Sequence, residues 1–281
     1  MALPRYRKVI ATSERMTLRT RLAEGYGELR EALTDWRVWH LMGSADIRKR
    51  FARSRLGQLW IILTTAITFS AMATMWALLW RVPLAEMLPY VAWSFVIWLL
   101  INGTIQENTA ALAEAKGYLI NQYMPPMNII LSIVYRNVLI FLMNATIPVA
   151  ISLWLGIWPG FGLLVVLAGL MVAVIFAVSL ATIVAIVCTR FRDVVQIILA
   201  AMQVFFYLTP ILWRPEQVPP FVRPFVMLNP FAAIMSLIRD PLLQREVPPE
   251  AFMVAAGSTI LIAVIALMLL GTYRRRLIYW L

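Results

Sequence analysis

The sequence predicts an all-α integral membrane protein with six transmembrane helices, an N-terminal amphipathic helix and short re-entrant helices on the outer side. Two observations carry this prediction. Of the 281 residues, 62% are hydrophobic and 14% are charged, a composition far from that of soluble domains. Residues 57–80 contain no charged side chain, and about 20 apolar residues are enough to cross the roughly 30 Å of a bilayer core. The chain is therefore predicted to lie in a membrane.

Each predicted crossing is an apolar run that is long enough for a helix and too long for a strand of a transmembrane barrel. The six runs comprise residues 57–80, 89–112, 127–155, 161–188, 194–213 and 251–273. They form one transmembrane domain, residues 46–281, after a polar, Arg-rich region at residues 1–45. That region has no apolar segment typical of a cleavable signal, so we expect the first crossing to be an internal anchor.

The distribution of lysine and arginine predicts the orientation of the chain. Thirteen of the 25 basic residues precede the first crossing, and three consecutive arginines, at residues 274–276, follow the last one. Since basic residues concentrate in cytoplasmic loops, we expect both termini to be cytoplasmic. The net charge of +11 is interpreted as this topology signal, and nucleic-acid binding is not expected.

Residues 28–42 predict an amphipathic helix in the cytoplasmic headgroup layer. Leu29, Leu33 and Trp36 recur there at helical spacing beside charged residues. The chain contains one histidine, His40, and one cysteine, Cys188. An intramolecular disulfide is therefore excluded, and a metal site is not expected.

A short cytoplasmic connector, residues 114–126, separates the second and third crossings. Polar residues let the preceding helix emerge into water, and Pro125 and Pro126 end a short helix expected at residues 118–124. This helix would present a set of side chains to a partner protein, namely Tyr118, Leu119, Ile120, Tyr123 and Met124. A loop that rests on the membrane fits the periodicity equally well.

The outer segment at residues 207–249 is apolar but repeatedly interrupted by proline. Proline prevents a continuous span, and the apolar side chains are unsuited to a free loop. Irregular backbone at membrane depth is tolerated where it is buried in protein or lines a cavity. We therefore expect short broken helices that form an external gate, with the candidate residues Pro210, Trp213, Phe221, Phe225 and Phe231.

Polar and aromatic side chains share faces of two predicted spans. Trp98 and Asn102 belong to one stripe of the second span, and a face of the fifth span carries Gln196, Gln203, Phe206 and Tyr207. Amides are costly in lipid and are expected to face the protein or a transport pathway. Aromatic rings beside amides suit sugar rings, while packing between helices explains the same pattern equally well.

Basic residues near the inner leaflet are candidates for binding an anionic phosphate. Arg136 lies near the cytoplasmic start of the third span, at a depth from which its side chain reaches the headgroups. Arg53 and Arg55 belong to the basic run that leads into the first span and are assigned the same role.

The sequence lacks the groups that would power transport by this chain alone. None of its three lysines precedes Ser or Thr, so the phosphate-binding loop of ATPases is missing. No carboxylate occurs in the middle of a predicted span, whereas ion-coupled transport usually needs one. Acidic residues are scattered singly, which argues against an enzyme with an acidic metal cluster. We expect a transport subunit driven by an external energy source.

Three segments resemble the membrane subunit of type-2 ABC exporters for bacterial surface polysaccharides. They are Ser54-Arg-Leu-Gly-Gln-Leu-Trp60, the connector from Leu119-Ile120 to Pro125, and the stretch from Phe191-Arg-Asp193 to Gln203-Val-Phe-Phe-Tyr-Leu-Thr-Pro-Ile-Leu-Trp213. The resemblance implies a homodimer of six-helix subunits with two copies of a separate cytoplasmic ATPase, which binds ATP and magnesium, and no cofactor in this chain. It also implies export of lipid-linked O-antigen, capsule or teichoic-type polymer across the bacterial inner membrane.

The same resemblance implies roles for individual segments. Residues 118–124 correspond to a coupling helix, residues 28–42 to an interface helix and residues 207–238 to the external gate. Candidates for sugar contact are Trp98, Phe205, Phe206 and Tyr207. A type-2 exporter of drugs or other small amphiphiles is the alternative, followed by a membrane scaffold or a glycosyltransferase.

Overall fold

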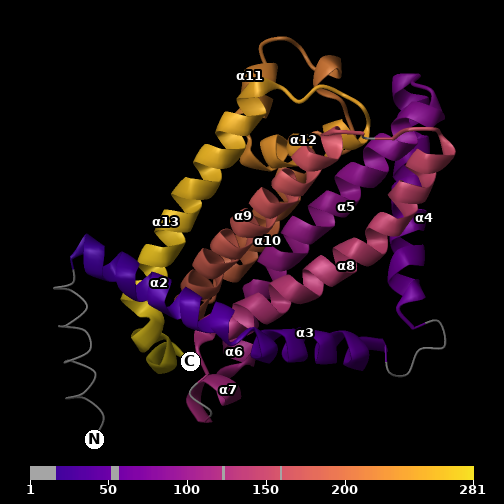
Figure 1. Cartoon of the computed structure of the whole chain (residues 1–281). Coiled ribbons are helices and arrows are strands. Elements are labelled where there is room, and N and C mark those ends of the chain that lie inside the picture. Colours follow the sequence, from indigo (N-terminus) through magenta and orange to yellow (C-terminus); the bar gives the residue numbers. More distant parts are fainter. Residues whose placement is uncertain (1–16, 52–56, 122–123, 159) are drawn as a thin grey trace, which may run out of the picture.

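The regular elements of the described residues are helices, and the longest of them run side by side (Figure 1). The computed structural model describes residues 17–51, 57–121, 124–158 and 160–281. Five of the described helices are long and apolar enough to cross a membrane: α4 (Leu59–Trp80), α5 (Leu84–Asn108), α8 (Pro126–Trp154), α9 (Gly162–Arg190) and α13 (Pro249–Trp280). The predicted class, an all-α membrane protein, is confirmed.

The predicted crossing at residues 194–213 is helical only over α10 (Val194–Leu208). At 1.5 Å per residue, its 15 residues extend about 22 Å, less than the roughly 30 Å of a bilayer core. The helix ends because Thr209 precedes Pro210 and adopts extended backbone, as residues before proline usually do. A short apolar helix followed by irregular backbone thus occupies the place of the fifth predicted crossing.

Shorter helices lie at both ends of the long ones (Figure 1). One end, here called the α7 end, carries α3 (Trp36–Phe51), α6 (Ala111–Glu114), α7 (Lys116–Asn121) and the C-terminus. Toward the other end, here called the α11 end, lie η1 (Pro215–Gln217), α11 (Arg223–Met227) and α12 (Pro230–Leu242). Each of these three helices has a proline at one of its first two positions. Proline is tolerated there because an N–H group in the first turn has no acceptor within the helix.

Helix α5 forms the centre of the packing. Tyr90, Ile97 and Ile101 are among its fully buried side chains, and it contacts α4, α8, α9, α10 and α12. A second buried cluster lies at the α7 end and joins α2 (Leu18–Thr34) and α6–α9 to α13. The cluster around α5 supports the α11 end, whereas the second cluster supports the connector and the N-terminal helices.

The amphipathic helix predicted at residues 28–42 is in fact two helices. Asp35 separates α2 from α3, so the predicted bounds are wrong. Helix α2 crosses α13 at two glycines, because a Cβ atom added to Gly25 or Gly271 would approach the backbone of the other helix closer than 3.0 Å. Small residues commonly permit such close approach between membrane helices. Packing on α13 therefore positions α2.

Candidate functional site

One face of α10 carries polar side chains that point away from the rest of the chain. Gln196, Gln203 and Tyr207 follow each other at spacings of seven and four residues, so they share this face, and all three are exposed. Tyr207 is 61% exposed. We call these three residues the α10 polar face. Amide groups in hydrocarbon are costly without hydrogen-bond partners, so this face requires a polar counterpart.

Aromatic packing holds the inward-facing sides of α10 and includes Phe206, which was predicted to share a face with the polar side chains. The ring centroids of Phe206 and Trp98 are 5.8 Å apart, and those of Phe205 and Phe231 are 4.9 Å apart. The ring centroids of Trp98 and Phe231 are also close, 5.7 Å apart. Trp98 is 3% exposed and presents no free face to a sugar in this conformation. These rings fasten α10 to α5 and α12, which is the packing role weighed for them from the sequence.

Asn102 lies one turn beyond Trp98 on α5. It is partly buried, and its side-chain oxygen has no hydrogen-bond partner among the described residues. This oxygen is an unused acceptor beside the aromatic cluster. The oxygen itself is buried, so in this conformation Asn102 offers no exposed acceptor to a substrate.

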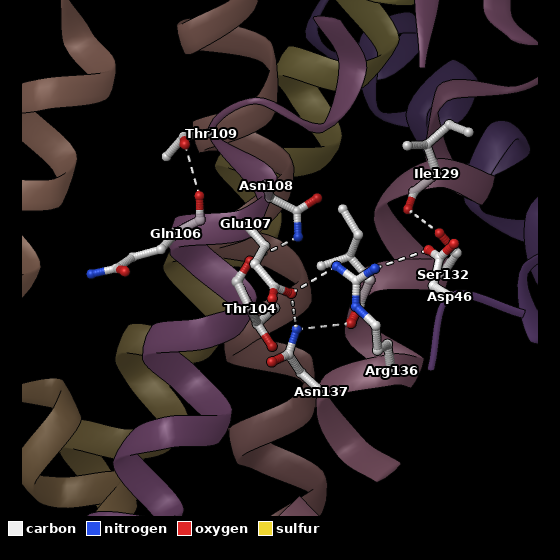
Figure 2. A network of polar contacts seen from close by, with 11 residues as sticks. Asp46, Thr104, Gln106, Glu107, Asn108, Thr109, Ile129, Ser132, Arg136 and Asn137 are labelled. Carbon is white, nitrogen blue, oxygen red and sulfur yellow. Dashed lines mark hydrogen bonds and ion pairs between the residues drawn. The ribbon is translucent and has the colours of Figure 1, made fainter. Parts of the chain in front are cut away.

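A polar network near the α7 end joins three helices (Figure 2). The Arg136 guanidinium on α8 pairs with Asp46 on α3 and with Glu107 on α5, each at an N–O distance of 2.9 Å. Asn137 donates from Nδ2 to the same Glu107 oxygen, at 2.6 Å. Both terminal nitrogens of Arg136 thus face carboxylates in the observed conformation, and its contact with phosphate stays a prediction. The other two candidates, Arg53 and Arg55, lie outside the described residues.

The connector differs from its prediction in length and in which side chains it exposes. The predicted helix at residues 118–124 is α7, Lys116–Asn121. Tyr118 is exposed, Ile120 and Met124 are partly buried, and Tyr123 lies outside the described residues. Leu119 is 2% exposed and packs in the second cluster, so its expected exposure is wrong. Tyr118 remains as an accessible aromatic side chain on this helix.

A charged contact links α2 to the last turns of α13. Arg274 pairs with Glu24 at 2.9 Å and with Glu28 at 3.5 Å. Burial raises the pKa of Glu28 from its ordinary value of 4.5 to about 7, and the nearby Arg274 charge opposes this rise. The backbone of Met127, at the start of α8, also opposes the rise in the pKa of Glu28. Residues 250 positions apart form this contact, and no local pattern indicates it.

Within the described ranges, no group of three His, Cys, Asp or Glu side chains is arranged to hold a metal ion.

At the α11 end, a buried arginine and a tyrosine organise the irregular chain after α10. The Tyr90 hydroxyl lies 3.0 Å from the carbonyl oxygens of both Pro210 and Trp213, which share its single proton. Arg239 is 2% exposed, and its Nη1 donates to the Pro210 carbonyl at 2.8 Å and to Ser94 Oγ at 3.2 Å. Sequence reasoning missed Tyr90 and Arg239, because their role depends on a carbonyl far away in the chain.

The predicted gate residues fall into two groups. Pro210 is buried beneath the Tyr90 and Arg239 contacts, Trp213 is partly buried, and Phe231 is buried in the aromatic cluster. Phe221 and Phe225 are largely exposed on the segment around α11. The first group holds the segment onto the helices, whereas the second presents an apolar surface to the surroundings.

Comparison with known proteins agrees with this architecture. The sequence profile of the ABC-2 type transporter family matches residues 38–243, from α3 through the end of α12. The chain is also similar to the O-antigen export system permease protein RfbA of Myxococcus xanthus, with 18% identity over 220 residues, which cover 77% of this chain and 85% of that protein. The family match spans well over half of the chain. The chain therefore belongs to the ABC-2 type transporter family, as a multi-pass membrane subunit for transport.

Proposed function

We propose that the chain is the channel-forming subunit of an ATP-driven exporter that moves lipid-linked polysaccharide across the bacterial inner membrane. It acts as a homodimer with two copies of a separate cytoplasmic ATPase. The observation that carries this proposal is the α10 polar face, which exposes two amides and a phenol on an otherwise apolar helix. Amides and aromatic rings together suit a carbohydrate, which combines hydroxyl groups with apolar C–H faces. The similarity to an O-antigen permease supports the same substrate class.

The charge distribution supports an orientation with the α7 end in the cytoplasm. Basic residues gather there at the end of α3, in α7 and in the last turns of α13, namely Arg48, Lys49, Arg50, Lys116, Arg274, Arg275 and Arg276. Cytoplasmic loops of membrane proteins carry such an excess. In this orientation, α7 and its exposed Tyr118 face the ATPase, and α11 and α12 face the outside.

The α10 polar face also supports a dimer. A single chain would present Gln196 and Gln203 to lipid, where unpaired amides are costly. In a dimer, the α10 helices of two copies enclose a shared polar pathway, and the amides face cargo or water. Helix α10 alone is too short to cross a bilayer, which is tolerated where the adjoining irregular backbone lines such a pathway.

Cysteine cross-linking tests the dimer. We expect Gln203→Cys, in a Cys188→Ala background, to form a covalent dimer in native membranes after mild oxidation. Ile260→Cys is the matched control, because Ile260 is 65% exposed on α13, away from α10. Cross-linking at residue 260 but not at residue 203 would contradict an interface at α10.

The substrate class is tested by ATPase measurements on the reconstituted chain and its candidate ATPase. Purified lipid-linked polysaccharide is expected to raise the hydrolysis rate, and Gln203→Leu is expected to reduce this stimulation. Thr74→Val is the control, because it also removes a polar group from an exposed position. The Thr74 hydroxyl donates to the Ser70 carbonyl of its own helix, so its loss should leave the pathway unchanged. Stimulation by small amphiphiles instead of glycan would transfer the assignment to a drug-type exporter. Failure of any ATPase to bind would refute the ATP-driven mechanism.

A further inference from the structure

A cavity of about 710 Å³ at the α11 end gathers guanidinium groups around one aromatic ring. Arg214, Arg239 and Arg245 line it together with Tyr90, and we call these four residues the guanidinium pocket. We propose that the guanidinium pocket binds the phosphate group of an anionic lipid at the outer face of the membrane. Such binding does not depend on which cargo the transporter exports.

The three guanidinium carbons lie close to the same phenol ring. Their distances to the Tyr90 ring centroid are 4.2 Å for Arg239, 5.5 Å for Arg214 and 5.4 Å for Arg245. The arginines come from α12 and from the loops before and after it, so the fold brings them together from separate segments. An aromatic face attracts cations, which helps to hold three like charges near one point. Their mutual repulsion remains and favours an anion between them.

The three arginines differ in how far their donors are already used. Two nitrogens of Arg239 already donate to protein acceptors. Its Nε donates to Asp240 at 2.8 Å, and its Nη1 donates to Ser94 and to the Pro210 carbonyl. Arg214 pairs through Nη1 with Glu86 at 3.1 Å, while its buried Nε and Nη2 have no partner among the described residues. Arg245 forms no ion pair with a described carboxylate at 4.0 Å or less. Arg214 and Arg245, which both line the cavity, therefore carry the guanidinium donors that no described carboxylate occupies.

The cavity wall carries one more arginine than carboxylates, and the additional arginine charge is balanced by Glu86 beside Arg214. Besides the guanidinium pocket, its charged lining residues are Arg223, Glu216, Asp240 and Glu246. Asp240 is neutralised by Arg239, and Arg223 donates to the backbone carbonyl of Glu216 at 3.3 Å. With Glu86, which pairs with Arg214 from outside the lining, four arginines meet four carboxylates. The guanidinium donors that the described residues leave unpaired on Arg214 and Arg245, rather than a net charge, therefore favour a ligand that supplies hydrogen-bond acceptors.

The chemistry of the pocket suits phosphate, and its surroundings suit the phosphate of a lipid. The planar guanidinium fork donates two parallel hydrogen bonds, which match the oxygens of phosphate. Arg223, Val226 and Met227 line the cavity from the α11 segment, whereas Phe221 and Phe225 of the same segment are exposed outward. An amphiphile thus finds charged donors within the pocket and an apolar surface beside it. Tyr90 lies within the first two turns of α5, which places the pocket near the polar boundary of the membrane.

Titration of the purified full-length chain in a neutral detergent tests this inference. The probes are dioctanoyl phosphatidylglycerol, dioctanoyl phosphatidylcholine with the same chains but no net charge, and inorganic phosphate alone. Binding is read from the rise in melting temperature with probe concentration, because a ligand of the folded state stabilises it by mass action. Arg245→Gln is the principal variant, and Arg214→Gln is a second one that acts on the other free donors. Arg81→Gln is the matched control, because Arg81 is an exposed arginine after α4 that does not line the cavity.

We expect phosphatidylglycerol to stabilise the wild type with a saturable dependence. Loss of a charge-assisted contact weakens binding by about tenfold or more, so both pocket variants should show this shift while Arg81→Gln retains the wild-type affinity. Equal stabilisation by phosphatidylcholine, or an equal loss in Arg81→Gln, would overturn the pocket as an anion site. If inorganic phosphate alone reproduces the effect at the same concentration, the ligand is a free anion and the lipid assignment fails.

Discussion

Replacing Arg239 by methionine should strongly destabilise the α11 end. Arg239 is 2% exposed and pairs with Asp240, whose side chain is 9% exposed, so the variant leaves a buried carboxylate without its partner. It also removes the hydrogen bonds to Ser94 and the Pro210 carbonyl. Loss of one member of a buried ion pair costs about 3–5 kcal/mol, and methionine of similar length limits any additional cavity. We expect the free energy of unfolding to fall by that amount.

Reversible unfolding of the chain in detergent micelles measures this change. The double variant Arg239→Met/Asp240→Asn removes both charges and should recover more than half of the lost stability. Arg275→Gln is the control, because Arg275 is 65% exposed, its ion pair with Glu24 is 3.6 Å long, and such surface pairs contribute at most about 1 kcal/mol. A loss below about 1 kcal/mol in Arg239→Met, or a double variant less stable than the single one, would refute the reasoning.

Two further changes test the packing of α2. Gly271→Ala places a methyl group against the Arg21 backbone and should lower the melting temperature and displace α2. Gly257→Ala on the same helix is the control, because its methyl group meets no atom within 4 Å and should leave the melting temperature unchanged. Equal effects of the two variants would contradict a tight crossing of α2 and α13. Burial raises the pKa of Glu28 from 4.5 to about 7, so the folded state retains a proton that the unfolded state releases. The free energy of unfolding should therefore fall as the pH rises from about 4.5 to about 7 and then level off. At 1.36 kcal/mol per pKa unit the full change is about 3 kcal/mol. Glu28→Gln should abolish this component in pH-dependent unfolding, and an unchanged pH profile would show that Glu28 does not titrate there.

The length of each apolar run predicted most of the helices. Crossing a bilayer requires about 20 consecutive apolar residues, and this requirement is local in the sequence. It located α4, α5, α8, α9 and α13. The prolines of residues 207–249 likewise indicated short broken helices, although the early end of α10 at Thr209 was not anticipated.

Individual side-chain roles were harder to predict, because they depend on which residues become neighbours. Arg136 was expected to meet phosphate, a contact that stays a prediction, and the sequence did not indicate that Asp46 and Glu107 pair with it from distant helices. Leu119 was expected at the surface, but α7 packs against the end of α13 and buries it. The exposure of Gln203, by contrast, follows from the position of α10 at the margin of the fold.

The sequence by itself determined that the chain is a helical membrane protein, roughly where its helices cross, and where its basic residues concentrate. These properties arise from composition over short stretches, because the bilayer selects apolar length directly. Only the tertiary structure decided that Arg239, Arg214 and Arg245 converge on Tyr90 and that Glu28 meets Arg274. Such contacts join residues far apart in the chain, and their energies depend on distance and burial, which no local pattern specifies.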